Sequence, residues 1–323
     1  MLRRIVVVVA GLLVLLIAVA GVALTWAHVA LRNAESPLPE LAALSAAPPP
    51  GDMPVSISYI NTASQPMPRA SVLDPSSDPT PQAPYVMSHP SFVLRWADGR
   101  ILLIDTGMTP EDAIAFGKPV EMLAGAQPTE AHGAVADVLG GHVGHVAGVM
   151  FTHLHTDHVG GLQALCAKHS RPLSLPMTHA QTAFTNYTTR PARKLIAGAG
   201  CAKVQEIQEG GLQPVPGFAG VSVFAAGGHT PDTQVILAAV NGAGGLRRYA
   251  FLGDVVNNID GINNNVPKPF FYRWFIVPED NVRLGDLRVL LRQLRDEAGV
   301  TLLPAHDQLA IEASGVPRYS EGG

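Results

Sequence analysis

The stretch FTHLHTDHVGG, residues 151–161, places four side chains able to bind a metal within six residues. His153 and His155 are two residues apart, so their side chains point to the same side of an extended strand end. Asp157 and His158 follow at the turn into the next helix, where Asp157 could also accept hydrogen bonds from backbone amides. Because adjacent side chains diverge, one ion cannot readily use all four groups. The stretch therefore predicts a site for two metal ions.

Strands and helices alternate on both sides of this stretch. Apolar and alternating runs predict strands over 55–59, 86–96, 101–105, 146–152, 221–225, 234–240, 248–252 and 300–303. Helices are expected from Thr109-Pro110 onward, over 159–168 and over 281–298. Residues 62–83 are rich in Pro, Ser and Asp and are expected to form a long loop. Alternating elements with several antiparallel hairpins predict a layered α/β fold.

The N-terminus carries a long apolar segment. Arg3 and Arg4 precede an uncharged run that reaches about residue 27. At about 1.5 Å per residue, some twenty residues cross a bilayer core of roughly 30 Å. Basic residues before the run keep the N-terminus in the cytoplasm. Two interpretations stay open: an anchor in a bacterial inner membrane with the rest of the chain in the periplasm, or a signal peptide cleaved after Ala27 and an exported body.

The remaining chain divides into two parts. Residues 28–54 are rich in Ala and Pro and are expected to form a linker, partly polyproline II. Residues 55–323 show few breaks in composition and are expected to form one domain, of a size common among enzymes. Residues 1–27 are thus the anchor or signal segment. The sequence makes no prediction about the oligomeric state.

Composition narrows the function. Of 323 residues, 47% are hydrophobic and 15% charged, which excludes a disordered chain. A net charge of −4 offers no basic surface, so nucleic acid is not expected as a partner. Two cysteines exclude a disulfide-rich scaffold and a four-cysteine zinc ribbon. In an exported body, Cys166 and Cys201 could form a disulfide or stay as buried thiols.

Residues 153–158 resemble the HxHxDH signature of the metallo-β-lactamase superfamily. Four further elements of the family pattern follow in the expected order: Asp105-Thr106-Gly107 at a strand end, Gly228-His229-Thr230-Pro231, a strand ending in Gly253-Asp254, and Ala305-His306 after the last strand. The resemblance spans about residues 55–310. It implies the four-layer αβ/βα sandwich of this family, preceded here by a transmembrane or signal helix.

The resemblance also implies the metal ligands, residue by residue. The first ion would be held by His153, His155 and His229, the second by Asp157, His158 and His306, and Asp254 would bridge them. Imidazole and carboxylate ligands without thiolate suit two Zn²⁺ ions best, with iron or manganese as alternatives.

Charge balance fits hydrolysis at such a site. Two divalent ions, two carboxylates and one bridging hydroxide leave a net charge of +1, which stabilises an anionic transition state. Asp157 is also the expected catalytic residue, because it could orient the hydroxide. Asp105 is expected either to support a ligand from behind or to fix the strand end. Outside these motifs, His89, His132, His142, His145 and His179 are expected on the surface or in packing, although His89 could line a cleft.

The resemblance implies a dinuclear hydrolase that cleaves an ester, lactone or related bond of a small molecule. His155 stands where flavodiiron proteins have Glu, and Asp254 stands where several β-lactamases have Cys, so neither activity is favoured. Lactonases that open acyl-homoserine lactones often place a Tyr three residues after the bridging Asp, where this chain has Asn257. Phosphodiester or organophosphate hydrolysis, a β-lactamase and an inactive metal-binding scaffold remain alternatives. The loops 62–83 and 257–274 are the candidate substrate walls.

Overall fold

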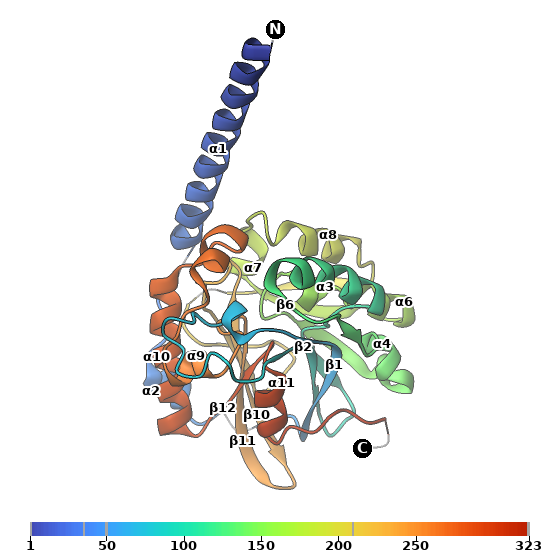
Figure 1. Cartoon of the computed structure of the whole chain (residues 1–323). Coiled ribbons are helices and arrows are strands. Elements are labelled where there is room, and N and C mark those ends of the chain that lie inside the picture. The colour runs from blue at the N-terminus through green and yellow to red at the C-terminus, as the bar shows by residue number, and fades with distance from the viewer. Residues whose placement is uncertain (1, 35, 49–50, 209, 322–323) are drawn as a thin grey trace.

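The computed structural model describes residues 2–34, 36–48, 51–208 and 210–321 (Figure 1). Its first sheet has seven strands in the order β4-β1-β2-β3-β5-β6-β7. β1, β2 and β3 pair antiparallel, whereas β3, β5, β6 and β7 run parallel. The strands are β1 (Ser56–Pro66), β2 (Val86–Arg95), β3 (Ile101–Ile104), β4 (Glu130–Ala131), β5 (Val146–Met150), β6 (Leu173–Thr178) and β7 (Ala202–Ile207).

The second sheet has five strands in the order β12-β11-β10-β9-β8. Its strands pair antiparallel except β11 and β12, which run parallel. They are β8 (Gln213–Pro214), β9 (Val221–Ala225), β10 (Gln234–Gly242), β11 (Gly245–Gly253) and β12 (Thr301–Pro304).

Three hydrophobic clusters define the layers. Between the sheets, Phe92 of β2 packs against Phe251 of β11 with ring centroids 4.9 Å apart. On the outer face of the first sheet lie α4 (Val135–Val138), α6 (Leu162–Lys168) and α8 (Arg190–Gly198). On the outer face of the second lie α2 (Leu41–Ser45) and α10 (Asn281–Ala298). This arrangement is the predicted four-layer αβ/βα sandwich.

Helix ends follow local chemistry. The side chain of Thr109 accepts a hydrogen bond from Asp112 N at the start of α3 (Pro110–Ala124), as the Thr-Pro signal predicts. The other helices are α1 (Leu2–Asn33), α5 (Thr156–Val159), α7 (His179–Ala183), α9 (Asp260–Asn263) and α11 (Gln308–Ala313), with 3₁₀ turns η1 (Arg69–Ser71) and η2 (Gly140–His145) and a π-helical turn η3 (Tyr272–Ile276).

Two expectations about these elements were wrong. The single helix expected over 159–168 is two helices, α5 and α6, separated by Gly160 and Gly161. A Cβ on Gly161 would lie 2.3 Å from the carbonyl oxygen of Thr106, so the chain needs glycine where it passes the Asp105 strand end. The loop expected from residue 62 begins only after Pro66, because β1 continues through polar but buried residues such as Thr62 and Gln65.

The N-terminal segment forms one continuous helix. α1 is long and apolar enough to cross a membrane, and it projects away from the domain (Figure 1). It continues past residue 27, and Leu31 is fully buried against the domain. Part of the segment expected as a linker also contacts the domain, since Leu44 packs in the outer core beside α10 and Arg248 donates to the carbonyl of Ser45 at 2.8 Å. The Ala/Pro-rich composition of this segment did not predict these contacts.

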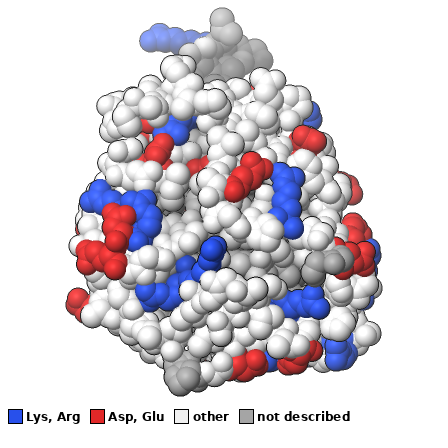
Figure 2. Space-filling model, turned by 90° about the horizontal axis from the view of Figure 1, so that it is seen from below, with Lys and Arg blue, Asp and Glu red and all other residues white. Residues whose placement is uncertain are grey.

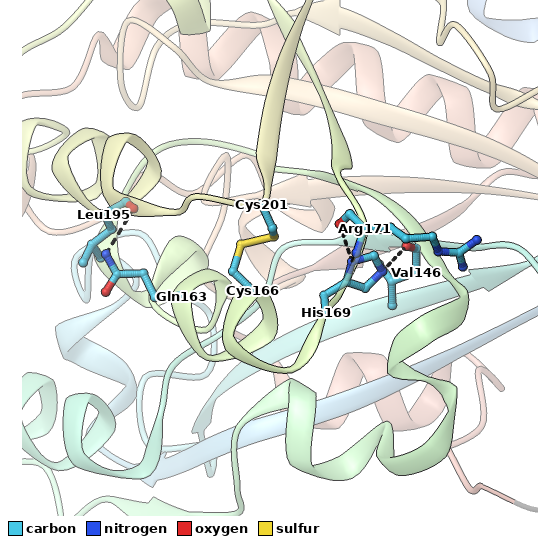
Figure 3. Close-up of a disulfide and its surroundings, with 7 residues drawn as sticks. All are labelled: Val146, Gln163, Cys166, His169, Arg171, Leu195 and Cys201. Carbon is cyan, nitrogen blue, oxygen red and sulfur yellow. Dashed lines mark hydrogen bonds between the residues drawn. A yellow bond between two sulfur atoms is a disulfide. The ribbon is translucent and has the colours of Figure 1, made fainter.

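The two cysteines form a disulfide between α6 and the start of β7, 35 residues apart (Figure 3). Next to it, His169 is held by the carbonyl oxygens of Arg171 and Val146. The bond resolves the two possibilities left open by the sequence, and it is typical of proteins in an oxidising compartment.

Candidate metal centre

All seven predicted site residues meet at one edge of the sandwich. Three of them follow strand ends: His153 comes after β5, Asp254 after β11 and His306 after β12. His155 lies at the start of α5, which carries Asp157 and His158, and His229 comes from the turn between β9 and β10. Loops after strand ends at one edge of a layered α/β fold are a usual place for functional side chains.

The first group of side chains is formed by three histidines and one carboxylate. His155 Nδ1 lies 3.0 Å from His153 Nε2 and 3.3 Å from His229 Nε2. His229 Nε2 lies 3.6 Å from Asp254 Oδ2. One ligand atom from each of these four residues lies within 4.8 Å of the others.

The second group shares the same aspartate. Asp254 Oδ1 lies 3.3 Å from His158 Nε2 and 3.0 Å from His306 Nε2. His306 Nε2 is also 3.3 Å from Asp157 Oδ2. The two oxygens of Asp254 therefore face the two groups, one each, as a bridging carboxylate requires.

Each histidine has its other ring nitrogen occupied. His229 Nδ1 lies 2.6 Å from Glu279 Oε1, and His306 Nδ1 lies 2.7 Å from the carbonyl oxygen of Ser88. The remaining pairs are His153 Nδ1 with Thr152 Oγ1, His155 Nε2 with Thr188 Oγ1 and His158 Nδ1 with Asp105 Oδ2. Such partners fix ring orientation and tautomer, and they leave the inward nitrogen free for a metal.

Protonation and burial fit a metal site. Burial lowers the pKa of His155 to about 3 and the pKa of His153 well below its usual value, so both imidazoles are neutral ligands. Burial opposes ionisation of Asp254, but His306 and His153 lower its pKa well below the usual range. His158 Nε2 and Asp254 Oδ1 are buried without a hydrogen bond of good geometry among the described residues. The first group thus offers neutral imidazoles and a carboxylate, which is what zinc requires. In the second group, neighbouring carboxylates outweigh burial: Asp105 and Asp157 raise the pKa of His158 well above its usual value, and Asp254 and Asp157 raise that of His306 to about 9. A metal bound there would therefore displace protons.

Asp105 supports the centre from behind. Its carboxylate accepts hydrogen bonds from the backbone amide and the hydroxyl of Thr152, both at 2.8 Å, and lies 2.9 Å from His158 Nδ1. Its backbone has a φ of 61°, which places it in the left-handed region. Asp105 thus joins the strand end before His153 to the imidazole of His158.

The sequence assigned His89 to the surface, to packing or to a cleft wall, and the structure buries it beside the second group. Its side chain is 2% exposed, and its Nδ1 lies 3.5 Å from Asp157 Oδ2. Together with Asp157 and His306 it forms a third group within 4.8 Å, and neither of its ring nitrogens makes a hydrogen bond among the described residues. Burial lowers its pKa to about 4. His89 stands alone on β2, so no motif in the sequence indicated it.

Other supporting groups were also missed. Glu279 lies 50 residues from His229 along the chain, and Lys268 donates to Glu279 Oε1 and to the carbonyl of Asp254, both at 2.6 Å. Thr188 is likewise distant in sequence from the histidine it contacts. Only the charged character of Glu279, just before α10, could have drawn attention, and the sequence assigned it no role.

The remaining histidines lie away from the centre. His132 contacts Ser64 Oγ at 2.9 Å, and His142 contacts the hydroxyl of Tyr319 at 2.6 Å. His179 pairs with Glu206, and none of them belongs to a metal-binding group among the described residues.

A cavity of about 540 Å³ opens over the centre. His155, Asp157, Asp254 and His306 form its polar floor. Both loops expected as substrate walls contribute to it, residues 62–83 through Met67, Ser71 and Val72, and residues 257–274 through Asn257, Pro269, Phe271 and Tyr272. α3 supplies the opposite wall with Phe116, Val120 and Leu123.

The loop 62–83 is held in place by a buried ion pair. Arg69 donates to both oxygens of Asp78, at 2.6 and 3.1 Å, and its guanidinium also bonds Asn258 and Asp260. Because Asn258 and Asp260 belong to the other wall, Arg69 connects the two walls of the cavity.

Known proteins of similar structure share this fold. An N-acyl homoserine lactone hydrolase, with the product N-hexanoyl-L-homoserine bound at its catalytic metal centre, is 16% identical, with a TM-score of 0.58 over 81% of this chain and 96% of its own. A quorum-quenching N-acyl homoserine lactone hydrolase is 18% identical, with a TM-score of 0.56 over 80% and 95%. A probable metal-dependent hydrolase from Staphylococcus aureus is 16% identical, with a TM-score of 0.52 over 80% and 91%.

Sequence comparison gives the family. None of the curated proteins matches the chain. The sequence model of the metallo-beta-lactamase superfamily matches residues 84–306, which is more than half of the chain and includes every predicted site residue. The chain belongs to the metallo-β-lactamase superfamily and is a metallo-hydrolase of that fold.

Proposed function

We propose that the protein is a dinuclear hydrolase that opens an ester or lactone bond in a small molecule with an apolar tail. The observation that carries the proposal is the pair of ligand groups that share Asp254 at the floor of an apolar cavity. The first group is His153, His155 and His229, and the second is Asp157, His158 and His306. Zinc fits them best, with iron or manganese as alternatives.

Metal bound in these groups would supply Lewis acidity and lower the pKa of water toward neutrality. The protein supplies positioning. Asp157 Oδ2 faces the cavity floor between His306 and His89, where a carboxylate can accept a proton and orient an attacking water. Glu279, Asp105 and Thr188 hold the imidazoles, so the floor is organised before substrate enters.

Tyr272 is the proposed contact to the substrate oxygen. It lines the cavity, and burial raises the pKa of its hydroxyl well above the usual value. The phenol therefore keeps its proton at neutral pH and can donate a hydrogen bond. It would provide the donor that many lactonases place three residues after the bridging aspartate, where this chain has Asn257.

The cavity lining favours a carbonyl substrate over a phosphoester. Among the described residues that line it, there is no Lys or Arg, the side chains that usually bind phosphate oxygens. Its walls are formed by side chains such as Phe116, Val120 and Phe271, which suit an acyl chain. The solved lactone hydrolase that holds N-hexanoyl-L-homoserine at its metal centre is consistent with this substrate class.

We place the catalytic domain outside the cytoplasm. α1 is an apolar helix of sufficient length to span a bilayer, and Arg3 and Arg4 precede its apolar run. The disulfide between Cys166 and Cys201 is typical of proteins in an oxidising compartment. The burial of Leu31 against the domain favours an anchor that is retained.

The function is tested on the full chain in detergent, loaded with zinc. An N-acyl homoserine lactone, an aryl ester and an aryl phosphodiester are assayed in parallel, with His155→Ala as the inactive control. Turnover of the lactone or the ester, lost in the control, supports the proposal. Turnover of the phosphodiester alone would replace it with phosphoester hydrolysis. A chain that binds two ions and turns over none of the three would contradict the proposed substrate class.

A further inference from the structure

The C-terminal part of α1 is fixed to the domain rather than connected by a tether. Ala27 and Leu31 are 2% and 0% exposed, although the helix before them is exposed on nearly every side. Arg32 Nε lies 2.8 Å from Asp280 Oδ2, at the start of α10. The apolar run 5–26 covers about 33 Å at 1.5 Å per residue, close to the thickness of a bilayer core. A membrane crossed by this run therefore ends where the domain begins.

Trp274 lies on the domain at the depth where the membrane-crossing run of α1 ends. Its ring lies 4.6 Å from the ring of His28, and its carbonyl oxygen lies 3.3 Å from His28 Nε2. His28 is two residues beyond Trp26, the end of the apolar run, or about 3 Å along the helix axis. Tryptophan and tyrosine at this depth are typical of the interface between lipid and water.

An apolar patch surrounds Trp274. We name it the aromatic lip, and it consists of exposed side chains from three segments: Met122, Leu123, Tyr187, Phe270, Phe271, Trp274, Phe275 and Ile276. Tyr187 joins the others through a hydrogen bond from its hydroxyl to the carbonyl of Ile276. More than half of the exposed large hydrophobic side chains described outside α1 belong to this lip. Scattered apolar residues are ordinary on a soluble surface, but a contiguous group usually marks a contact.

The lip is also the rim of the cavity. Leu123 (80% exposed), Phe271 (65%) and Ile276 (44%) reach solvent and line the cavity over the metal centre at the same time. Figure 1 shows α3, which carries Leu123, on the side of the domain from which α1 projects. The opposite face, seen in Figure 2, carries both basic and acidic side chains over its surface. The apolar opening and the membrane helix therefore share one side of the molecule.

We propose that the aromatic lip inserts into the surface of the membrane that α1 crosses, so that the cavity opens onto the lipid leaflet. The substrate would be an amphiphile whose apolar tail is dissolved in that leaflet and whose ester or lactone head reaches the metal centre. The docking rests on the lip and its contact with α1. Only the statement about substrate rests on the proposed function.

Fluorescence quenching tests the docking without any activity. The full chain is reconstituted in phosphatidylcholine vesicles with and without lipid brominated near the head-group end of the acyl chains. Trp26→Phe removes the tryptophan of α1, and Trp96 is buried and contributes a constant background. Brominated lipid should quench the Trp26→Phe protein, and this quenching should disappear when Trp274→Phe is added.

A matched control places a tryptophan at the far end of the domain. Leu246 is 51% exposed at the β10–β11 turn. The substitution Leu246→Trp is made in the chain that carries Trp26→Phe and Trp274→Phe. Brominated lipid should not quench the fluorescence of the tryptophan introduced there. Equal quenching of Trp274 and of Leu246→Trp, or none at either, would overturn the proposal. If neither tryptophan is quenched, the alternative is that a second copy of the chain covers the lip. Cross-linking between two chains through lip residues would show this.

Activity tests the route of the substrate. Met122→Glu, Phe270→Glu and Phe275→Glu are combined, because these lip residues do not line the cavity. Hydrolysis of a long-chain ester or lactone in vesicles should fall at least tenfold, while a water-soluble short-chain ester keeps its rate. Val204→Glu, Leu246→Glu and Leu309→Glu, exposed elsewhere, form the control and should change neither rate. An equal loss of rate on both substrates would contradict delivery of the substrate from the leaflet. If the unmodified chain hydrolyses neither substrate, the result would instead contradict the proposed function.

Discussion

Glu279 Oε1 lies 2.6 Å from His229 Nδ1 and 2.6 Å from Lys268 Nζ, in a pocket closed to solvent. Burial opposes ionisation of Glu279, but Lys268 and His229 lower its pKa, so the carboxylate is charged. Lys268 also donates to the carbonyl of Asp254. One buried lysine thus links the residue that supports His229 to the backbone of the aspartate shared by both groups.

Glu279→Gln should weaken the site without removing a ligand. The change keeps the size of the side chain but loses the charge that orients His229, and removal of such partners typically costs about 10–100-fold in metal affinity or activity. Zinc affinity and kcat/KM are measured together. Glu206→Gln, at an exposed glutamate paired with His179, is the matched control and should change neither. Wild-type zinc affinity in Glu279→Gln would argue against this role.

Asp254→Ala should abolish the two-metal site. Both groups lose a ligand, and His158 and His306 lose the carboxylate that faces them, so turnover should fall by several orders of magnitude. Elemental analysis should find two zinc ions per wild-type chain and fewer than two in the variant. A chelator should inactivate the wild type, and added zinc should restore it. Turnover near the wild-type rate in metal-replete buffer would refute the assignment of this centre.

His89→Ala should selectively weaken the second group. His89 lies beside Asp157 and His306 but not beside His153 or His155, so the first ion should bind as in the wild type. Zinc titration should show one affinity unchanged and the other reduced about tenfold. His132→Ala removes a histidine outside the centre and serves as the control. Two unchanged affinities would mean that His89 only packs.

Tyr272→Phe should reduce kcat on a lactone about tenfold and leave KM nearly unchanged, because a hydrogen bond made mainly in the transition state acts on kcat. Tyr187→Phe removes a hydroxyl at the rim and should have little effect. A change confined to KM would instead make Tyr272 part of general substrate binding.

Asp78→Asn should destabilise the protein most at neutral pH. The Arg69 guanidinium holds the pKa of Asp78 below its usual value, so the folded state favours the charged carboxylate. This contribution is present above the pKa of the unfolded chain, near 4, and is lost as pH falls through the lower folded value. Removing one partner of a buried pair costs about 3–5 kcal/mol. The two proteins should differ widely in thermal unfolding at pH 7, and the difference should shrink as pH falls below 4. A constant difference would contradict this account.

The parts of the fold that local sequence determines were predicted. α10 has the bounds 281–298 expected from its apolar spacing, and Asp280 and Gly299 supply the start and stop chemistry. The seven candidate site residues could be proposed because each stands in a short motif of the family pattern, and the structure brings all seven together. Motifs of this kind combine backbone geometry and side-chain chemistry within a few residues, which makes them readable without the fold.

The parts that depend on tertiary contacts were not predicted. The end of β1 is polar in sequence, yet Gln65 is buried and donates to the carbonyl oxygens of Gly117 and Gln127. Hydropathy cannot show that distant groups satisfy such a side chain. Glu279, Thr188 and His89 were missed for the same reason, because their partners lie far along the chain.

The contact between α1 and Trp274 determines which measure of substrate concentration controls the rate of hydrolysis. An enzyme whose opening lies in a leaflet samples its substrate in two dimensions. Its rate then follows the mole fraction of substrate among the surrounding lipids, so adding inert lipid at constant total substrate should slow turnover. The same cavity on a soluble domain would depend only on molarity. Leu31 and His28 hold α1 against the domain and so fix where the metal centre lies. By the same contacts, α1 determines how the rate of hydrolysis depends on substrate concentration.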